Sequence, residues 1–123
     1  MEESIKNIRD TILKFGERAV EDYQKEDVAS LTGARTDNYL SLLSGYSAML
    51  EERMGELEVL EAKFMVANRD KWKSNADTEI QWKGSDAGLD KIVLKRQLNA
   101  CDKVISACKN RLKRLQQESF NQI

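Results

Sequence analysis

Few side chains in this 123-residue sequence are of the types that carry out chemistry. The sequence contains no histidine, the residue most often used for acid–base catalysis near neutral pH. Its two cysteines, Cys101 and Cys108, therefore have no imidazole to activate them as nucleophiles. On one helix a spacing of seven residues separates them by about 10 Å of rise, so they cannot form a disulfide within it. We expect both to be buried thiols on a packing face.

Glycine and carboxylate patterns also give no sign of an enzyme. Gly84 and Gly88 are not followed by the Lys-Ser or Lys-Thr of a phosphate-binding loop. The glutamates of the predicted second helix lie mostly off its apolar stripe, so we expect a solvated acidic face and not a metal site. These residues are Glu51, Glu52, Glu56, Glu58 and Glu61. The sequence therefore predicts a protein that is not an enzyme and has no cofactor and no metal site.

The composition of the sequence predicts that all of these residues lie on helices or on the turns between helices. Apolar residues make up 41% and charged residues 33%, which is typical of a folded domain with a heavily charged surface. Proline is absent, so long helices need not be interrupted, and we find no strand pattern. We expect a single all-α domain over residues 1–123. No apolar run approaches the roughly 20 residues of a membrane span, and no signal peptide is recognisable, so we expect a cytoplasmic protein.

An amphipathic N-terminal helix is predicted from about Glu3 to Val28, within residues 1–30. Its apolar stripe comprises Ile5, Ile8, Ile12, Phe15, Ala19 and Tyr23. A turn should follow in which Gly33 takes positive φ, with Thr36 or Asp37 as the N-cap of the next helix. This helix could pack within the protomer or across a subunit boundary.

Two longer helices are predicted after that turn. The first runs from about residue 37 to 73 or 74, with a stripe of Leu43, Tyr46, Leu50, Leu57, Leu60, Phe64 and Ala67. The second runs over about 89–118, in strict heptad steps through Leu94, Leu98, Cys101, Ile105, Cys108, Leu112 and Leu115, and Ile92 and Val104 widen the stripe. A polar break over 74–88 separates them and has room for another turn or two of helix at 77–83. We expect an elongated antiparallel hairpin or coiled coil, with the rest of its seams forming a homo-oligomer.

The last helix is strongly basic. Between residues 91 and 114, Asp102 is the only acid among eight bases: Lys91, Lys95, Arg96, Lys103, Lys109, Arg111, Lys113 and Arg114. One explanation is that these bases pair with the acidic helix, the segment 109–114 facing residues 51–61 or somewhat before them and fixing the register of the hairpin. The other is that they form a track for a phosphate backbone.

Two tryptophans lie among further bases near the expected tip of the hairpin. Trp72 is part of Arg69-Asp70-Lys71-Trp72-Lys73, and Trp82 is part of Gln81-Trp82-Lys83. Each indole could pack over a helix end, or lie exposed and stack on an unpaired base. If the indoles are exposed, the residues that we expect to bind nucleic acid include Trp82, Lys83, Lys91, Lys95 and Arg96.

The segment Ala67-Asn68-Arg69-Asp70-Lys71-Trp72-Lys73-Ser74, at the end of a long helix and before a polar break and a basic helix, resembles phage UvsY-type recombination mediators. The resemblance covers about residues 37–118. Members of that family are small, helical, ring-forming proteins that bind single-stranded DNA and help to load a RecA-like recombinase. The resemblance implies that Arg69, Lys71 and Lys73 contact phosphates and that Trp72 stacks on a base.

The sequence thus leads to two functional hypotheses. In the first, the protein is an oligomeric accessory protein that binds single-stranded nucleic acid, such as a recombination mediator. In the alternative, it is a helical protein–protein interaction module, either a scaffold or an inhibitor of a larger machine, and does not bind nucleic acid.

Overall fold

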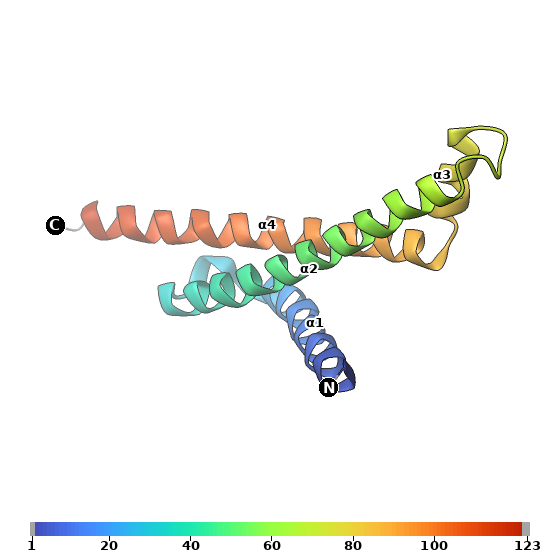
Figure 1. Ribbon diagram of the computed structural model, residues 1–123. Helices are drawn as coiled ribbons and strands as arrows, with labels where there is room; N and C mark the ends of the chain where they lie inside the picture. Colours follow the sequence, from blue (N-terminus) through green and yellow to red (C-terminus); the bar gives the residue numbers. More distant parts are fainter. Residues whose placement is uncertain (1, 122–123) are drawn as a thin grey trace. The chain divides into compact units, whose positions relative to one another are not determined.

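A computed structural model describes the backbone of residues 2–121 and the side chains of residues 13–120. It contains helices α1 (Glu2–Lys25), α2 (Gly33–Ala67), α3 (Asn75–Lys83) and α4 (Asp86–Asn121), with a 3₁₀ turn at Val28–Ser30 (Figure 1). No strand occurs within residues 2–121, so the all-α prediction is confirmed. None of the helices described is both long and apolar enough to cross a membrane.

The chain divides into two compact units. We call Leu50–Leu98 the central unit, and Met1–Met49 with Asn99–Ile123 the terminal unit. Helices α2 and α4 each contribute residues to both units.

In the terminal unit, α2 and α4 pack antiparallel. The Cys101 thiol lies 3.3 Å from the carbonyl oxygen of Leu43, whereas Leu115, about four turns further along α4, lies beside Gly33 at the start of α2. Both Cys101 and Cys108 are fully buried, as predicted, and burial raises the pKa of Cys101 to about 11. Their thiols are therefore neutral near pH 7 and fill space in the core.

Helix α1 packs on α2 within the same protomer. A Cβ atom at Gly16 would lie only 2.1 Å from the ring of the buried Tyr46, so the absence of a side chain allows the two helices to approach. About two turns further on, the rings of Tyr23 and Tyr39 meet edge to face, with centroids 5.5 Å apart. Phe15 is exposed, so its assignment to the packing stripe was wrong, since the adjacent Gly16 makes the contact instead. The predicted stripe residues Ile5, Ile8 and Ile12 lie outside the side chains described.

The predicted seams are only partly buried. On α4, Leu94 and Val104 are buried like the two cysteines, whereas Leu98, Ile105, Leu112 and Leu115 are half-buried and form the margin of the seam. On α2, Leu43, Tyr46, Leu50 and Leu57 are buried and Phe64 is half-buried. The predicted core positions Leu60, Ala67 and Ile92 are exposed. A helix of 3.6 residues per turn drifts against a seven-residue repeat, which carries such positions to the side of the contact.

Side-chain caps move the predicted helix boundaries. The Thr32 hydroxyl accepts a hydrogen bond from the backbone N–H of Arg35, so α2 begins at Gly33. The expectation that Thr36 or Asp37 caps α2 was therefore wrong, as was a positive φ at Gly33, because this earlier cap makes Gly33 part of the helix. At the other end, α2 stops at Ala67 and the Asn68 side chain bonds back to the Phe64 carbonyl oxygen at 2.8 Å.

Two serines begin the next helices. Ser74 accepts from the backbone N–H of Asp77, which starts α3, and Ser85 accepts from the N–H of Gly88, which starts α4 three residues earlier than predicted. The region 77–83 is thus part of a complete nine-residue helix.

Candidate interaction surface of the central unit

All nine residues predicted to bind nucleic acid belong to the central unit. Its aromatic side chains form one cluster, in which the ring of Phe64 lies 6.0 Å from that of Trp72 and 5.6 Å from that of Trp82, centroid to centroid. Trp82 is 4% exposed, so the prediction that it stacks on a base was wrong: its indole is enclosed by the packing of the unit. Trp72 is half-buried and stacks on Phe64, and the Lys71 ammonium lies 5.0 Å from the centre of its ring.

A close backbone contact fixes the position of Trp82. A Cβ atom on Gly88 would lie 2.1 Å from the Trp82 carbonyl oxygen and 2.8 Å from the Cα of Lys83. The end of α3 therefore rests directly on the first turn of α4, and only glycine fits between them. The Trp82 carbonyl oxygen also accepts hydrogen bonds from the backbone and hydroxyl of Ser85.

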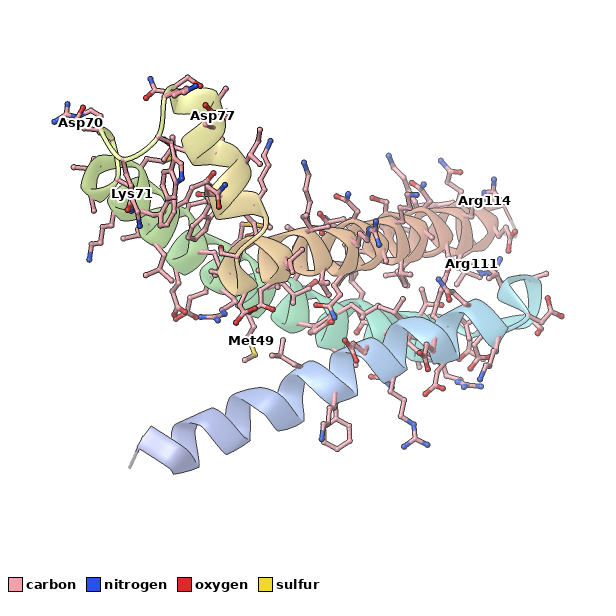
Figure 2. All side chains as sticks on the ribbon, turned by 90° about the vertical axis from the view of Figure 1, so that its right-hand side faces the viewer. Met49, Asp70, Lys71, Asp77, Arg111 and Arg114 are labelled. Atoms are coloured by element: carbon pink, nitrogen blue, oxygen red, sulfur yellow. The ribbon has the colours of Figure 1, made fainter. Side chains whose placement is uncertain are left out.

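The basic residues of this unit differ in their surroundings. Lys91 forms a 2.8 Å ion pair with Glu61 and is partly buried, so its charge is partly offset within the unit, and its contact with a phosphate stays a prediction. The other predicted bases are exposed, and no ion pair joins them to the residues described; they are Arg69, Lys71, Lys73, Lys83, Lys95 and Arg96. Asp70 and Lys71 lie in the connection between α2 and α3, and Asp77 lies in the first turn of α3 (Figure 2).

The predicted register of charges was wrong. Glu61 pairs with Lys91 and not with the segment 109–114. In the terminal unit, Arg111 instead donates hydrogen bonds to the carbonyl oxygens of Ala29 and Leu31, at 3.1 and 3.2 Å. The physical reason is that α2 ends at Ala67 and a separate helix, α3, occupies residues 75–83, so α4 does not turn back from residue 73 as the predicted hairpin required.

The bases near the turn alternate with acids along the sequence, so this segment carries no net positive charge. Residues 68–90 contain four bases, namely Arg69, Lys71, Lys73 and Lys83. The same segment contains five acids, namely Asp70, Asp77, Glu79, Asp86 and Asp90. Nearby acids offset the phosphate attraction that exposed lysines and arginines would otherwise supply.

Exposed aliphatic side chains on α4 form the most distinctive surface of the central unit. Leu89, Ile92 and Val93 are 51%, 45% and 52% exposed and follow one another at i, i+3 and i+4, so they share one side of the helix. Asp86 and Arg96, both exposed, lie three residues before and three residues after them. We call these five residues the α4 face. Sequence reasoning assigned Ile92 to the core and overlooked the others, although their spacing defines a second apolar stripe beside that of Leu94.

Nothing in the structure described assembles a catalytic centre around this surface. No group of three or more potential metal ligands occurs among the residues described. The prediction that the protein is not an enzyme is consistent with the neutral, enclosed thiols but stays a prediction.

Comparison of the chain with protein-family models, with curated proteins and with solved structures gives no match. The likeness to UvsY-type mediators therefore remains a prediction from the sequence.

Proposed function

We propose that this protein is a non-enzymatic helical interaction module that assembles with a second copy of itself through the α4 face. The observation that carries the proposal is the exposure of three large aliphatic side chains on consecutive turns of one helix. Such a stripe is typical of a helix that docks on another helix or in a groove, since burying each side chain contributes about 1.5–3 kcal/mol.

The order of charges on the α4 face favours a second copy as the partner. An acid, Asp86, precedes the aliphatic residues and a base, Arg96, follows them. When two such faces pack antiparallel about a two-fold axis, Asp86 of each copy meets Arg96 of the other. A parallel arrangement would instead place like charges together. The face is thus complementary to itself in one orientation only.

The first test is the mass of the protein in solution, measured by size-exclusion chromatography with light scattering. We expect the native chain to be a dimer and Ile92→Lys to be a monomer, because the new charge would be desolvated at the centre of the interface. Val66→Lys is the matched control: Val66 is 71% exposed on α2 and lies outside the α4 face, so this variant should remain dimeric. A native chain that is monomeric at 100 μM (about the concentration used for sizing) would refute self-assembly.

Charge exchange tests the antiparallel arrangement. Asp86→Arg and Arg96→Asp should each weaken the dimer by about tenfold, because each replaces two opposite-charge contacts by like-charge ones. The double variant should recover the native dissociation constant, since it restores both pairs with their signs reversed. Failure of the double variant to recover would rule out this pairing, and circular dichroism would establish that each variant is folded.

The exposed bases favour a second candidate, binding to single-stranded nucleic acid. Lys73 and Lys83 are exposed and have no ion pair within the part of the chain described, and both lie outside the α4 face. We expect an oligonucleotide to bind at about 50 mM salt and to be released by about 200 mM, because phosphate contacts weaken steeply with salt. Fluorescence anisotropy of a labelled single strand would measure this.

The variants for nucleic-acid binding are chosen outside the α4 face, so that this function is tested separately from dimer formation. Lys73→Gln with Lys83→Gln should weaken binding, whereas Lys14→Gln, an exposed base of the terminal unit, should not. The absence of binding at about 50 mM salt would exclude nucleic acid and leave the interaction module.

A further inference from the structure

A pocket of about 440 Å³ lies in the terminal unit, where α4 meets the end of α1 and the 3₁₀ turn. Its polar lining comes from Tyr23, Asn110, Arg111 and Arg114, and its apolar lining from Val28, Ala29 and Ala107. Figure 2 shows Arg111 and Arg114 on the same stretch of α4, with Arg111 next to the connection between α1 and α2. The lining contains two arginines and no acid.

Two of the lining residues hold buried polar atoms that have no hydrogen-bond partner among the residues described. These are the hydroxyl oxygen of Tyr23 and the Nε atom of Arg111. Tyr23 is only 7% exposed, and burial raises the pKa of its hydroxyl, which therefore keeps its proton near pH 7. Burying a polar group without a partner destabilises a fold, so such atoms are suited to bind an ordered water, an ion or a ligand.

The unused groups are all able to donate. The Tyr23 hydroxyl, the Arg111 Nε–H, the Arg114 guanidinium and the Asn110 amide each carry at least one N–H or O–H. The Arg111 Nη2 atom already donates to two carbonyl oxygens of the α1–α2 connection, which holds the guanidinium in place. A fixed arginine beside other donors is suited to a group with several acceptor oxygens and negative charge.

We infer that this pocket binds a small organic anion with a phosphate-type head group. The oxygens of the head group would accept from Tyr23, Arg111 and Arg114, and the organic part would lie on Val28 and Ala107. A volume of about 440 Å³ exceeds that needed for an inorganic anion alone and is in the range of small-molecule sites. This site lies in the terminal unit and does not depend on the α4 face.

The test uses the intact protein and two probes, inorganic phosphate and phenyl phosphate, each compared with sodium chloride at equal ionic strength. Saturating phenyl phosphate, at ten times its Kd, should raise Tm by about 5 °C. Calorimetric titration should show phenyl phosphate binding several-fold more tightly than phosphate, because its ring reaches the apolar wall. Equal or weaker binding of phenyl phosphate would overturn the assignment of an organic ligand.

Three variants separate a site from a general salt effect. Tyr23→Phe removes only the hydroxyl, so without ligand its Tm should be no lower than that of the native protein, and it should lose most of the rise caused by phenyl phosphate. Arg114→Gln should also lose the rise. Lys103→Gln removes an exposed base elsewhere on α4 in the same unit and should keep it. A rise of equal size in all three variants would show general stabilisation by the anion and would overturn the proposal.

Discussion

Replacing Gly88 by alanine is expected to lower the free energy of unfolding by about 3 kcal/mol. The added Cβ would lie 2.1 Å from the Trp82 carbonyl oxygen and 2.9 Å from that of Lys83. These are backbone atoms, which cannot rotate away as the end of a side chain could. The end of α3 must therefore move off α4, which opens the packing around the Trp82 indole. Urea unfolding followed by tryptophan emission measures the effect, because Trp72 and Trp82 both belong to the central unit.

Gly55→Ala is the matched control for this experiment. Gly55 lies in the middle of α2 and in the same unit, and a Cβ atom there meets nothing within 4 Å. Alanine should stabilise the protein by up to about 1 kcal/mol, because glycine is the weaker helix former. If both variants shifted stability in the same direction, the close contact between α3 and α4 would be misplaced.

A second large effect is expected from Leu43→Ala, which should destabilise the protein by about 3 kcal/mol. Leu43 is fully buried in the terminal unit, where α2 meets Cys101 of α4. Truncation removes buried methyl groups and leaves a cavity that neighbouring helices can only partly fill. Thermal or urea unfolding followed by circular dichroism at 222 nm gives the difference in stability.

The neighbouring residue supplies the control. Leu42 is 49% exposed, so Leu42→Ala loses little buried area and should cost less than about 1 kcal/mol. Comparable losses at positions 42 and 43 would mean that the side of α2 facing α4 is assigned incorrectly.

Periodicity in the sequence was sufficient to predict the antiparallel pairing of α2 and α4 and the burial of Cys101 and Cys108. Heptad spacing determines which side of a helix is apolar, and that side has to be covered. Helix ends were less predictable, because Thr32 and Thr36 are both acceptable caps and only their three-dimensional surroundings select the first. Helix α3 was foreseen only as a turn or two, since nine residues are too few for a clear apolar stripe.

The candidate site was harder to predict because it depends on register. Which residues face one another across the hairpin depends on where α2 ends and α4 begins, and Glu61 meets Lys91 because α2 ends at Ala67 and α4 begins at Asp86. The surroundings of Trp72 and Trp82 also depend on Phe64, which precedes them by 8 and 18 residues and meets both only after the chain turns. Local residue patterns contain no information about such contacts.

The division of the chain at residues 49 and 99 has a kinetic consequence. The central unit is one continuous stretch of sequence, whereas the terminal unit joins two stretches that the central one separates. While residues 50–98 are unfolded, forming the terminal unit requires closure of a long, flexible loop, which is entropically unfavourable. Prior folding of the central unit shortens that loop. We therefore expect an ordered folding reaction in which contacts among residues 50–98 form early and those joining the two ends of the chain form late.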